Sequence, residues 1–261
     1  MCIVVLAWQT VPNKPLILFG NRDEFYQRDA APLAIWSQNL THDSTHSSII
    51  AGRDLQSGGT WLGMTASGRW AIITNYREQP NLPPDAITRG ALVTDYLKGD
   101  SDPLAFLHSV NQSQYAGFNL IVGTLTNAAV LGNRGTPPQT LRAGIHVLSN
   151  ALLDTEWPKT NRLLRGFQSL DLTANDDVLV TSGFDLLNDE TKASTTDLPN
   201  TGIGIEMEKV LSSIRIDSSI YGTRVSSVLV LGNEGFTFAE KTLRPVEGGV
   251  VRLVGTYNFE I

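Results

Sequence analysis

Short apolar runs rich in β-branched residues are separated by turn residues at both ends of the chain, which is typical of strands joined as hairpins. Residues 2–8 and 16–20 flank one Pro/Asn turn, and residues 60–65 and 69–75 flank an Ala-Ser-Gly turn. Each pair therefore predicts an antiparallel hairpin. Further strands are predicted over residues 119–124, 128–131, 145–149, 223–231, 236–240 and 250–257.

Helical periodicity is confined to two blocks in the middle of the chain. The first block contains residues 88–98 and 102–113, where Asp102 is suited to cap the second helix and a proline occupies its first position. The second block contains residues 160–168 and 205–214. Helices gathered in separate blocks are expected to cover the faces of a sheet rather than to alternate with its strands.

Together these elements predict an α+β fold, a four-layer αββα sandwich of two antiparallel sheets between helical layers. Residues 30–48, which are rich in Pro, Ser, Thr and His, are expected to form an irregular excursion. The chain shows no internal repeat and no linker composition. We therefore expect residues 1–261 to form a single domain.

Composition narrows the class of protein. The chain of 261 residues is 41% hydrophobic and 18% charged, and its net charge of −6 argues against nucleic-acid binding, which needs an excess of Lys and Arg. No apolar run approaches the ~20 residues of a membrane-spanning helix. The single cysteine allows no intrachain disulfide, which fits a reducing compartment. We predict a cytoplasmic protein with no membrane span and a small-molecule ligand.

Cys2 is the strongest candidate for chemistry. Methionine is commonly removed before a small second residue, and its removal would leave a thiol and an α-amino group on one carbon. With pKa values of about 8 for the amine and about 8.5 for the thiol, the amine can accept the proton of the nucleophile. The alternative is that Cys2 is a small apolar residue at the start of a buried strand.

Polar residues at strand ends are the other candidates. A guanidinium near the thiol lowers its pKa, a carboxylate can hold the α-ammonium group, and a carboxamide can donate to an oxyanion. Ordinary turn residues and solvated ion pairs are the alternative interpretation. The candidates are Arg22, Asp23, Asn75, Asn150 and Arg224. By contrast, His42 and His46 flank Asp43 in an irregular segment, which is a poor ligand set, and we predict no metal site.

Several motifs, taken in their order along the chain, resemble the NRDE family, also called the transport and Golgi organization protein 2 family. Single motifs are common, whereas their order and spacing make the resemblance specific. It spans the chain and implies an N-terminal-nucleophile hydrolase-like fold. The motifs are MCI at residues 1–3, NRDEF at 21–25, GGTWLG at 58–63, TNY at 74–76, LSN at 148–150 and YGTR at 221–224.

The resemblance extends to conjugated-bile-acid hydrolases and penicillin V acylases, and it implies roles for individual residues. Cys2 matches their nucleophile, Arg22 and Arg224 their arginines, Asp23 their aspartate, and Asn75 and Asn150 their two asparagines. The enzymes space the early arginine and aspartate apart, whereas Arg22 and Asp23 are adjacent here. Glu24 could therefore take the role of the aspartate.

Two functions remain open, together with a scaffold that has an inactive pocket. The first is hydrolysis of a non-peptide C–N amide bond by Cys2, which requires no cofactor. The second, implied by the resemblance alone, is haem binding and haem trafficking in the same pocket, with Cys2 as a thiolate ligand. Both require the sulfur to be exposed in a cleft and to face guanidinium and carboxamide groups.

Overall fold

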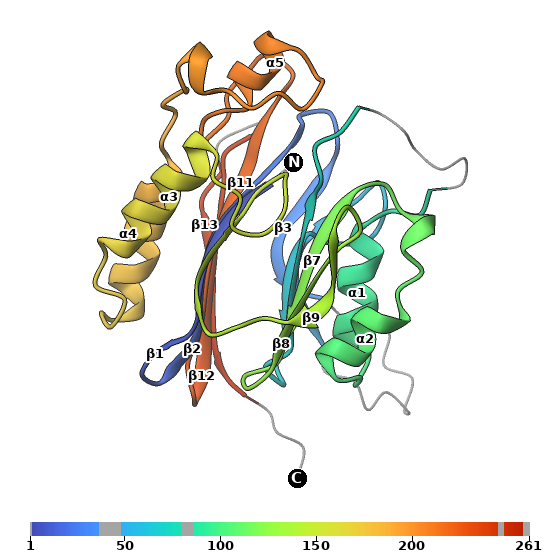
Figure 1. Cartoon of the computed structure of the whole chain (residues 1–261). Helices are drawn as coiled ribbons and strands as arrows, with labels where there is room; N and C mark the ends of the chain where they lie inside the picture. Colours follow the sequence, from blue (N-terminus) through green and yellow to red (C-terminus); the bar gives the residue numbers. More distant parts are fainter. Residues whose placement is uncertain (1, 37–47, 80–85, 245–247, 258–261) are drawn as a thin grey trace.

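Two antiparallel sheets face each other in the computed structural model, which describes residues 2–36, 48–79, 86–244 and 248–257 (Figure 1). The first sheet has six strands, and each neighbouring pair is antiparallel. In spatial order its strands are β10 (Gly144–Leu148), β1 (Cys2–Val11), β2 (Lys14–Phe25), β11 (Tyr221–Leu231), β12 (Gly235–Thr242) and β13 (Val250–Thr256).

The second sheet has seven strands, which follow one another in chain order as a meander. Its predicted hairpin at residues 60–75 is present as β5 and β6, and the predicted strands at 119–131 are present as β7 and β8. The strands are β3 (Ala30–Ile35), β4 (Ile49–Asp54), β5 (Leu62–Thr65), β6 (Trp70–Asn75), β7 (Phe118–Gly123), β8 (Ala128–Gly132) and β9 (Thr136–Thr140).

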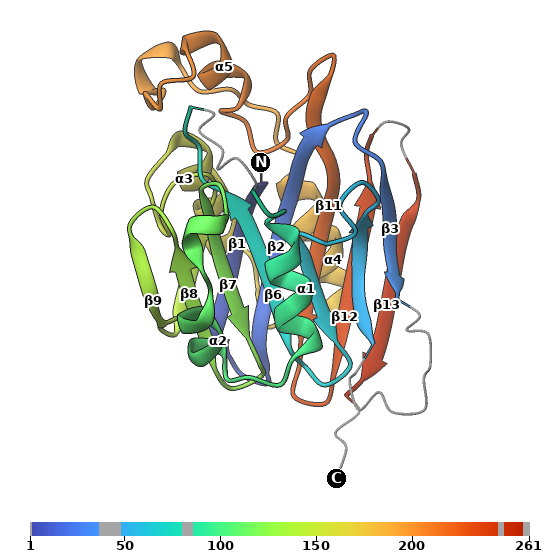
Figure 2. The ribbon, with the colours of Figure 1, turned by 90° about the vertical axis from the view of Figure 1, so that its right-hand side faces the viewer.

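Helices cover the outer face of each sheet, which gives four layers (Figures 1 and 2). Helices α1 (Gly90–Lys98) and α2 (Pro103–Ser109) pack on the second sheet, and α3 (Pro158–Gln168) and α4 (Asp176–Leu187) pack on the first. The short α5 (Ile205–Val210) lies at the end of the sandwich where the chain begins. Among the described residues, none of the helices has the length and apolarity needed to cross a bilayer. The predicted αββα sandwich is confirmed.

Strand β1 is buried on both faces and positions the start of the chain inside the sandwich. Cys2, Val4 and Leu6 belong to the core between the sheets, whereas Ile3 and Val5 belong to the core beneath α3 and α4. This alternation follows from the two-residue period of a strand. It also explains why the opening of the sequence is an unbroken apolar run, because both sets of side chains leave water.

Four elements differ from the prediction. Strand β3 occupies the first part of the segment expected to be irregular; residues 37–47 of that segment lie outside the described residues. Strand β9 contains two adjacent prolines and is tolerated because it lies at the edge of its sheet. Helix α4 was missed because its β-branched residues obscure the period, although Asn175 caps it. The helix expected over residues 205–214 ends at Val210.

Candidate active site

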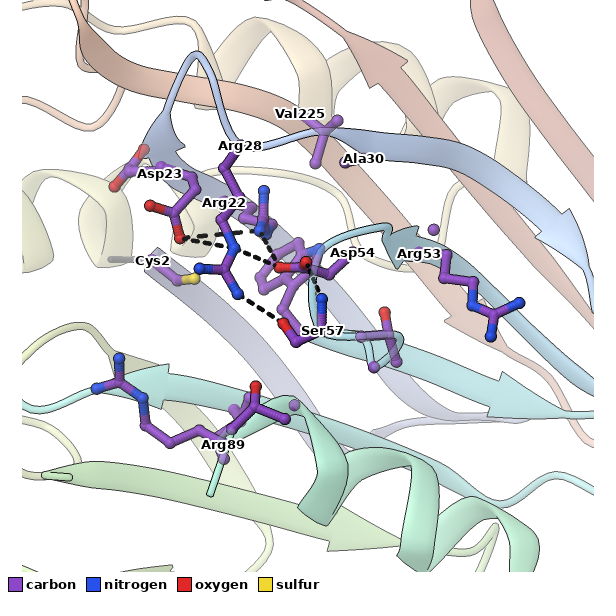
Figure 3. A pocket seen from close by; sticks show the side chains of 18 of the residues that line it. Cys2, Arg22, Asp23, Arg28, Ala30, Arg53, Asp54, Ser57, Arg89 and Val225 are labelled. Carbon is purple, nitrogen blue, oxygen red and sulfur yellow. Dashed lines mark hydrogen bonds and ion pairs between the residues drawn. The ribbon is translucent and has the colours of Figure 1, made fainter. Parts of the chain in front are cut away.

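A cavity of about 120 Å³ opens where the two sheets meet beside the start of β1 (Figure 3). One wall comes from β1, β2, β11 and β12 of the first sheet, and the other from β3, β4, β6 and residues 88–90 at the start of α1. The side chains of Cys2, Arg22, Asp54, Asn75, Arg89 and Glu240 are part of the cavity wall.

Cys2 lines this cavity, but the residue is only 6% exposed. Both functions considered from the sequence require an exposed sulfur, whereas the structure buries it at the cavity wall. Burial raises the pKa of the Cys2 thiol to about 11, while the positive charge of Arg22 and a hydrogen bond from the backbone of Asp23 act to lower it. The thiol therefore holds its proton at neutral pH. A reaction at this sulfur requires a base that removes the proton as the bond to the substrate forms.

Arg22 lies directly opposite Cys2 in the β1–β2 ladder, so both side chains leave the same face of the sheet. Its Nη2 is 3.1 Å from Asp54 Oδ2, and Arg28 Nε donates to the same oxygen at 2.6 Å. Burial acts to raise the pKa of Asp54, but these arginine contacts lower it overall. Arg22 Nη1 is buried and has no hydrogen-bond partner among the described residues.

Asp23 follows Arg22 along β2, so its side chain leaves the opposite face of the first sheet. Its Oδ1 accepts a hydrogen bond from Thr223 Oγ1 at 2.7 Å, and burial raises the pKa of the carboxyl although nearby Lys159 acts to lower it. Glu24 is the neighbour on the same face as Arg22, with Oε2 3.8 Å from Arg22 Nη2. Thus Glu24, the open alternative, contacts the arginine, whereas Asp23, which also borders the cavity, accepts a hydrogen bond from Thr223 on β11.

Asn75 and Asn150 meet at the end of the sandwich that carries Cys2. Asn75 ends β6 and lines the cavity, and Asn150 Nδ2 donates to the Asn75 backbone oxygen at 3.0 Å. Asn150 is 1% exposed and is not part of the cavity wall. Its neighbour Ser149 donates from Oγ to the Cys2 backbone oxygen at 3.0 Å. The 149–150 segment therefore joins the end of β6 in the second sheet to the start of β1 in the first.

Arg224 is buried but does not line the cavity. A bulge in β11 between Thr223 and Val225 displaces it from the regular register. Its Nη1 donates to the backbone oxygens of the turn that follows β2, and its Nε donates to the Arg244 backbone oxygen at 3.0 Å. Arg224 thus holds the turn beyond Arg22 rather than the cavity itself.

Charged residues near the cavity that were not among the sequence candidates include Arg28, Asp54, Arg89, Glu240 and Lys159. For two of them the sequence carries a signal. Lys159 falls in line with Leu163 and Phe167 at helical spacing, so it occupies the buried stripe of α3. Glu240 falls in line with Phe236 and Phe238 at strand spacing, which places it on the inner face. A charged residue in a buried stripe is the signal that identifies both.

The described residues contain no group of three or more His, Cys, Asp or Glu side chains placed to hold a metal ion. His42, Asp43 and His46, already considered unfavourable as ligands, lie outside the described residues. His146 instead bonds Asp154, with Nδ1 2.8 Å from Oδ2. It therefore holds the loop that precedes α3.

The antiparallel sandwich, with a cysteine at the start of a central buried strand, defines an N-terminal-nucleophile hydrolase-like fold. Two solved structures share it, both variants of the conjugated bile acid hydrolase from Clostridium perfringens. One has a TM-score of 0.52 at 8% identity and covers 100% of this chain and 97% of its own. The other has a TM-score of 0.56 at 10% identity, with 98% and 97% covered. At these identities the likeness shows the fold alone.

Sequence comparison is more specific. The family model of Transport and Golgi organisation 2 matches residues 1–245. The Transport and Golgi organization 2 homologues from Homo sapiens and Mus musculus are 35% and 33% identical to this chain over 269 residues, with 93% of each chain covered. The Drosophila melanogaster protein is 25% identical over 276 residues. The chain therefore belongs to the Transport and Golgi organisation 2 family, as its motifs indicated.

Proposed function

We propose that the chain is a cysteine amidohydrolase of the N-terminal-nucleophile type that cleaves a non-peptide C–N amide bond in a small molecule. The observation that carries the proposal is that Cys2 and Arg22 from one sheet and Asn75 from the other line the same cavity. The fold shared with a conjugated bile acid hydrolase supports a hydrolytic use of this arrangement, although fold alone does not define activity.

The reaction begins after removal of Met1, when the α-amine of Cys2 accepts the thiol proton as the sulfur attacks the amide carbon. A C–S bond forms and the carbonyl oxygen becomes an oxyanion, to which the Asn75 carboxamide donates. The C–N bond then breaks, and the proton held by the α-amine passes to the leaving amine. Water hydrolyses the resulting thioester, releasing a carboxylic acid and restoring the thiol.

Arg22 has two uses in this scheme. Its charge stabilises the thiolate form of Cys2, which burial disfavours. Its Nη1 has no hydrogen-bond partner among the described residues and is assigned in this scheme to an acceptor on the substrate. Asn150 contributes indirectly, since it bonds the backbone of Asn75 and does not line the cavity.

Mass spectrometry after treatment with a cysteine-reactive amide mimic tests the proposal. Cys2 is the only cysteine of the sequence, so an adduct has a single thiol to which it can belong. We expect a chain without Met1 that gains one adduct, no adduct in Cys2→Ala, and release of amine from a panel of small N-acyl amides by the wild type alone. Retained Met1 together with an unmodified Cys2 would exclude this mechanism.

Haem binding in the same cavity is the second candidate. It is favoured by the cluster of arginines, since Arg22, Arg28 and Arg89 line the cavity with Cys2 and can pair with carboxylates. The volume of about 120 Å³ is below the ~300–1,000 Å³ typical of ligand sites, which favours a small acyl group instead. A saturable Soret shift that is lost in Cys2→Ala supports haem ligation, and the absence of a saturable shift rejects it.

A further inference from the structure

Lys159 is a buried lysine behind the Cys2 site. It lies in the first turn of α3, is 2% exposed and shares the buried stripe of the helix with Leu163 and Phe167. A buried ammonium group costs several kcal/mol unless it is well paired. A leucine or methionine would fill this position without that cost, so packing alone does not account for a lysine here.

The polar and charged groups around Lys159 come from both sides of the Cys2 site. Within the described part of the chain, the hydrogen bond of Lys159 runs from Nζ to Asn150 Oδ1, at 3.5 Å. Burial lowers the pKa of Lys159 to about 7, and the positive charge of Arg77 acts in the same direction. The groups whose ionised forms oppose this effect are Asp23, Cys2 and Glu208; Glu208 is itself paired with Arg77 at 2.6 Å.

The contact from Lys159 supports the orientation of the Asn150 carboxamide that the bond from Nδ2 to the Asn75 backbone oxygen requires. Ser149 Oγ lies within bonding distance of both the Cys2 backbone oxygen, at 3.0 Å, and Asn150 Oδ1, at 3.2 Å. A serine hydroxyl has one proton, so it cannot donate to both. When it donates to Cys2, Lys159 is the donor that keeps Asn150 Oδ1 in place and Nδ2 toward the Asn75 backbone.

We propose that Lys159 is a positioning residue of the Cys2 site, whose amine fixes the Asn150 carboxamide and, through it, the end of β6 that carries Asn75. The inference rests on the proposed function, because it assigns Asn75 as the donor that must be held. Lys159 touches neither the substrate nor the thiol in this scheme. Its charge acts on Cys2 over a longer distance, and it favours the thiolate.

Two variants separate the contributions of the amine. Lys159→Met removes both the hydrogen bond and the charge, whereas Lys159→Gln keeps a donor for Asn150 and removes only the charge. Lys192→Met, at an exposed position, is the matched control. The first readout is the side-chain amide resonance of Asn150, followed by NMR from about pH 5.5 to about pH 8.5. The second is the rate at which iodoacetamide alkylates Cys2 over the same range.

We expect the Asn150 resonance of the wild type to shift with a midpoint near 7. The shift should be absent in both Lys159 variants and retained in Lys192→Met. Below about pH 7, where Lys159 is charged, we also expect alkylation of Cys2 to slow by about threefold to tenfold in both variants, since each loses the charge that favours the thiolate. Lys159→Gln should keep the orientation of Asn150, and Lys159→Met should lose it.

An Asn150 resonance that does not titrate in the wild type would overturn the inference, whatever the reactivity of Cys2. So would a Lys159→Met variant that has lower stability but the wild-type alkylation rate at every pH. If Lys159→Met does not fold, the Lys159→Gln variant and the titration of the wild type decide whether Lys159 has the positioning role. A titrating Asn150 beside an inert wild-type Cys2 would count against the hydrolase and leave the positioning role of Lys159 standing.

Discussion

Cys2 and Arg22 are cross-strand partners at the open end of the β1–β2 hairpin. Because paired residues project from the same face of a sheet, the hairpin register alone brings the guanidinium beside the thiol. Asp54 takes one side of that guanidinium, at 3.1 Å, and leaves Nη1 without a partner among the described residues. The pairing thus gives the buried sulfur a neighbouring positive charge.

Replacing Arg22 by glutamine should raise the pKa of the Cys2 thiol, because the guanidinium is one of the charges that lower it. At a fixed pH near 8 we expect iodoacetamide to react with Cys2 about tenfold more slowly than in the wild type. Arg165→Gln, an exposed arginine in the last turn of α3, is the control and should react at the wild-type rate. Equal rates in wild type and Arg22→Gln would show that the charge does not reach the sulfur.

Arg224→Met should weaken the fold and leave Cys2 reactivity unchanged. The side chain donates from Nη1 to the backbone oxygens of Phe25, Tyr26 and Arg28, and the substitution removes this donor from all three. We expect a loss of about 2–4 kcal/mol in the free energy of unfolding, measured in urea. A folded variant with slower alkylation of Cys2 and full stability would instead place Arg224 in the site.

The hairpins and the αββα layering could be predicted from the sequence because they depend on local patterns. The pairing of Cys2 with Arg22 follows from the length of one hairpin. The environments of Arg224 and Asn150 could not be predicted, since they depend on a bulge in β11 and on a contact between the segment after β10 and the end of β6. Glu240 is buried by residues that are distant in the sequence. The pattern of its own strand shows only a charged residue at a position where an apolar one is expected.

The contact between His146 and Asp154 should make stability depend on pH. The hydrogen bond to Asp154 is the largest of the effects that raise the pKa of His146. A histidine with a raised pKa in the folded state stabilises the protein fully below its unfolded value of about 6.5, and this contribution is lost as the pH rises through the folded value. For a partly exposed pair it amounts to roughly 0.5–1 kcal/mol.

Asp154→Asn tests this contribution with little other change. Asparagine retains an oxygen for the backbone N–H of Val147 and tolerates the positive φ of 60° at this position. In urea the variant should be less stable than the wild type near pH 5.5, and the difference should shrink as the pH rises toward about 8.5. Asp185→Asn, on the exposed side of α4, is the control. A difference that grows with pH would contradict the assignment.

Glu240 bridges the two sheets as a buried acid at the cavity wall. Its Oε1 accepts a hydrogen bond from the Leu33 backbone N–H of β3 at 2.8 Å, and Ser227 Oγ donates to Oε2 at 3.4 Å. A Cβ atom at Gly52 on β4 would approach Oε2 to 3.1 Å, so the glycine leaves room for the carboxyl group. Burial raises the pKa of Glu240 to about 7.

This pKa predicts that Glu240 makes the fold less stable as the pH rises. Between the ordinary value of 4.5 and about 7, the folded chain keeps a proton that the unfolded chain has lost, so the free energy of unfolding falls across that window. Glu240→Gln keeps an acceptor for Leu33 and cannot ionise. Its free energy of unfolding, measured by urea denaturation, should therefore rise relative to that of the wild type by up to about 3 kcal/mol between pH 4.5 and pH 7.5. Glu234→Gln, in an exposed turn, should follow the wild type. Parallel curves for wild type and Glu240→Gln would mean that the carboxyl is already ionised at pH 4.5 and that a cation, for which Arg22 is the nearest candidate, compensates its burial.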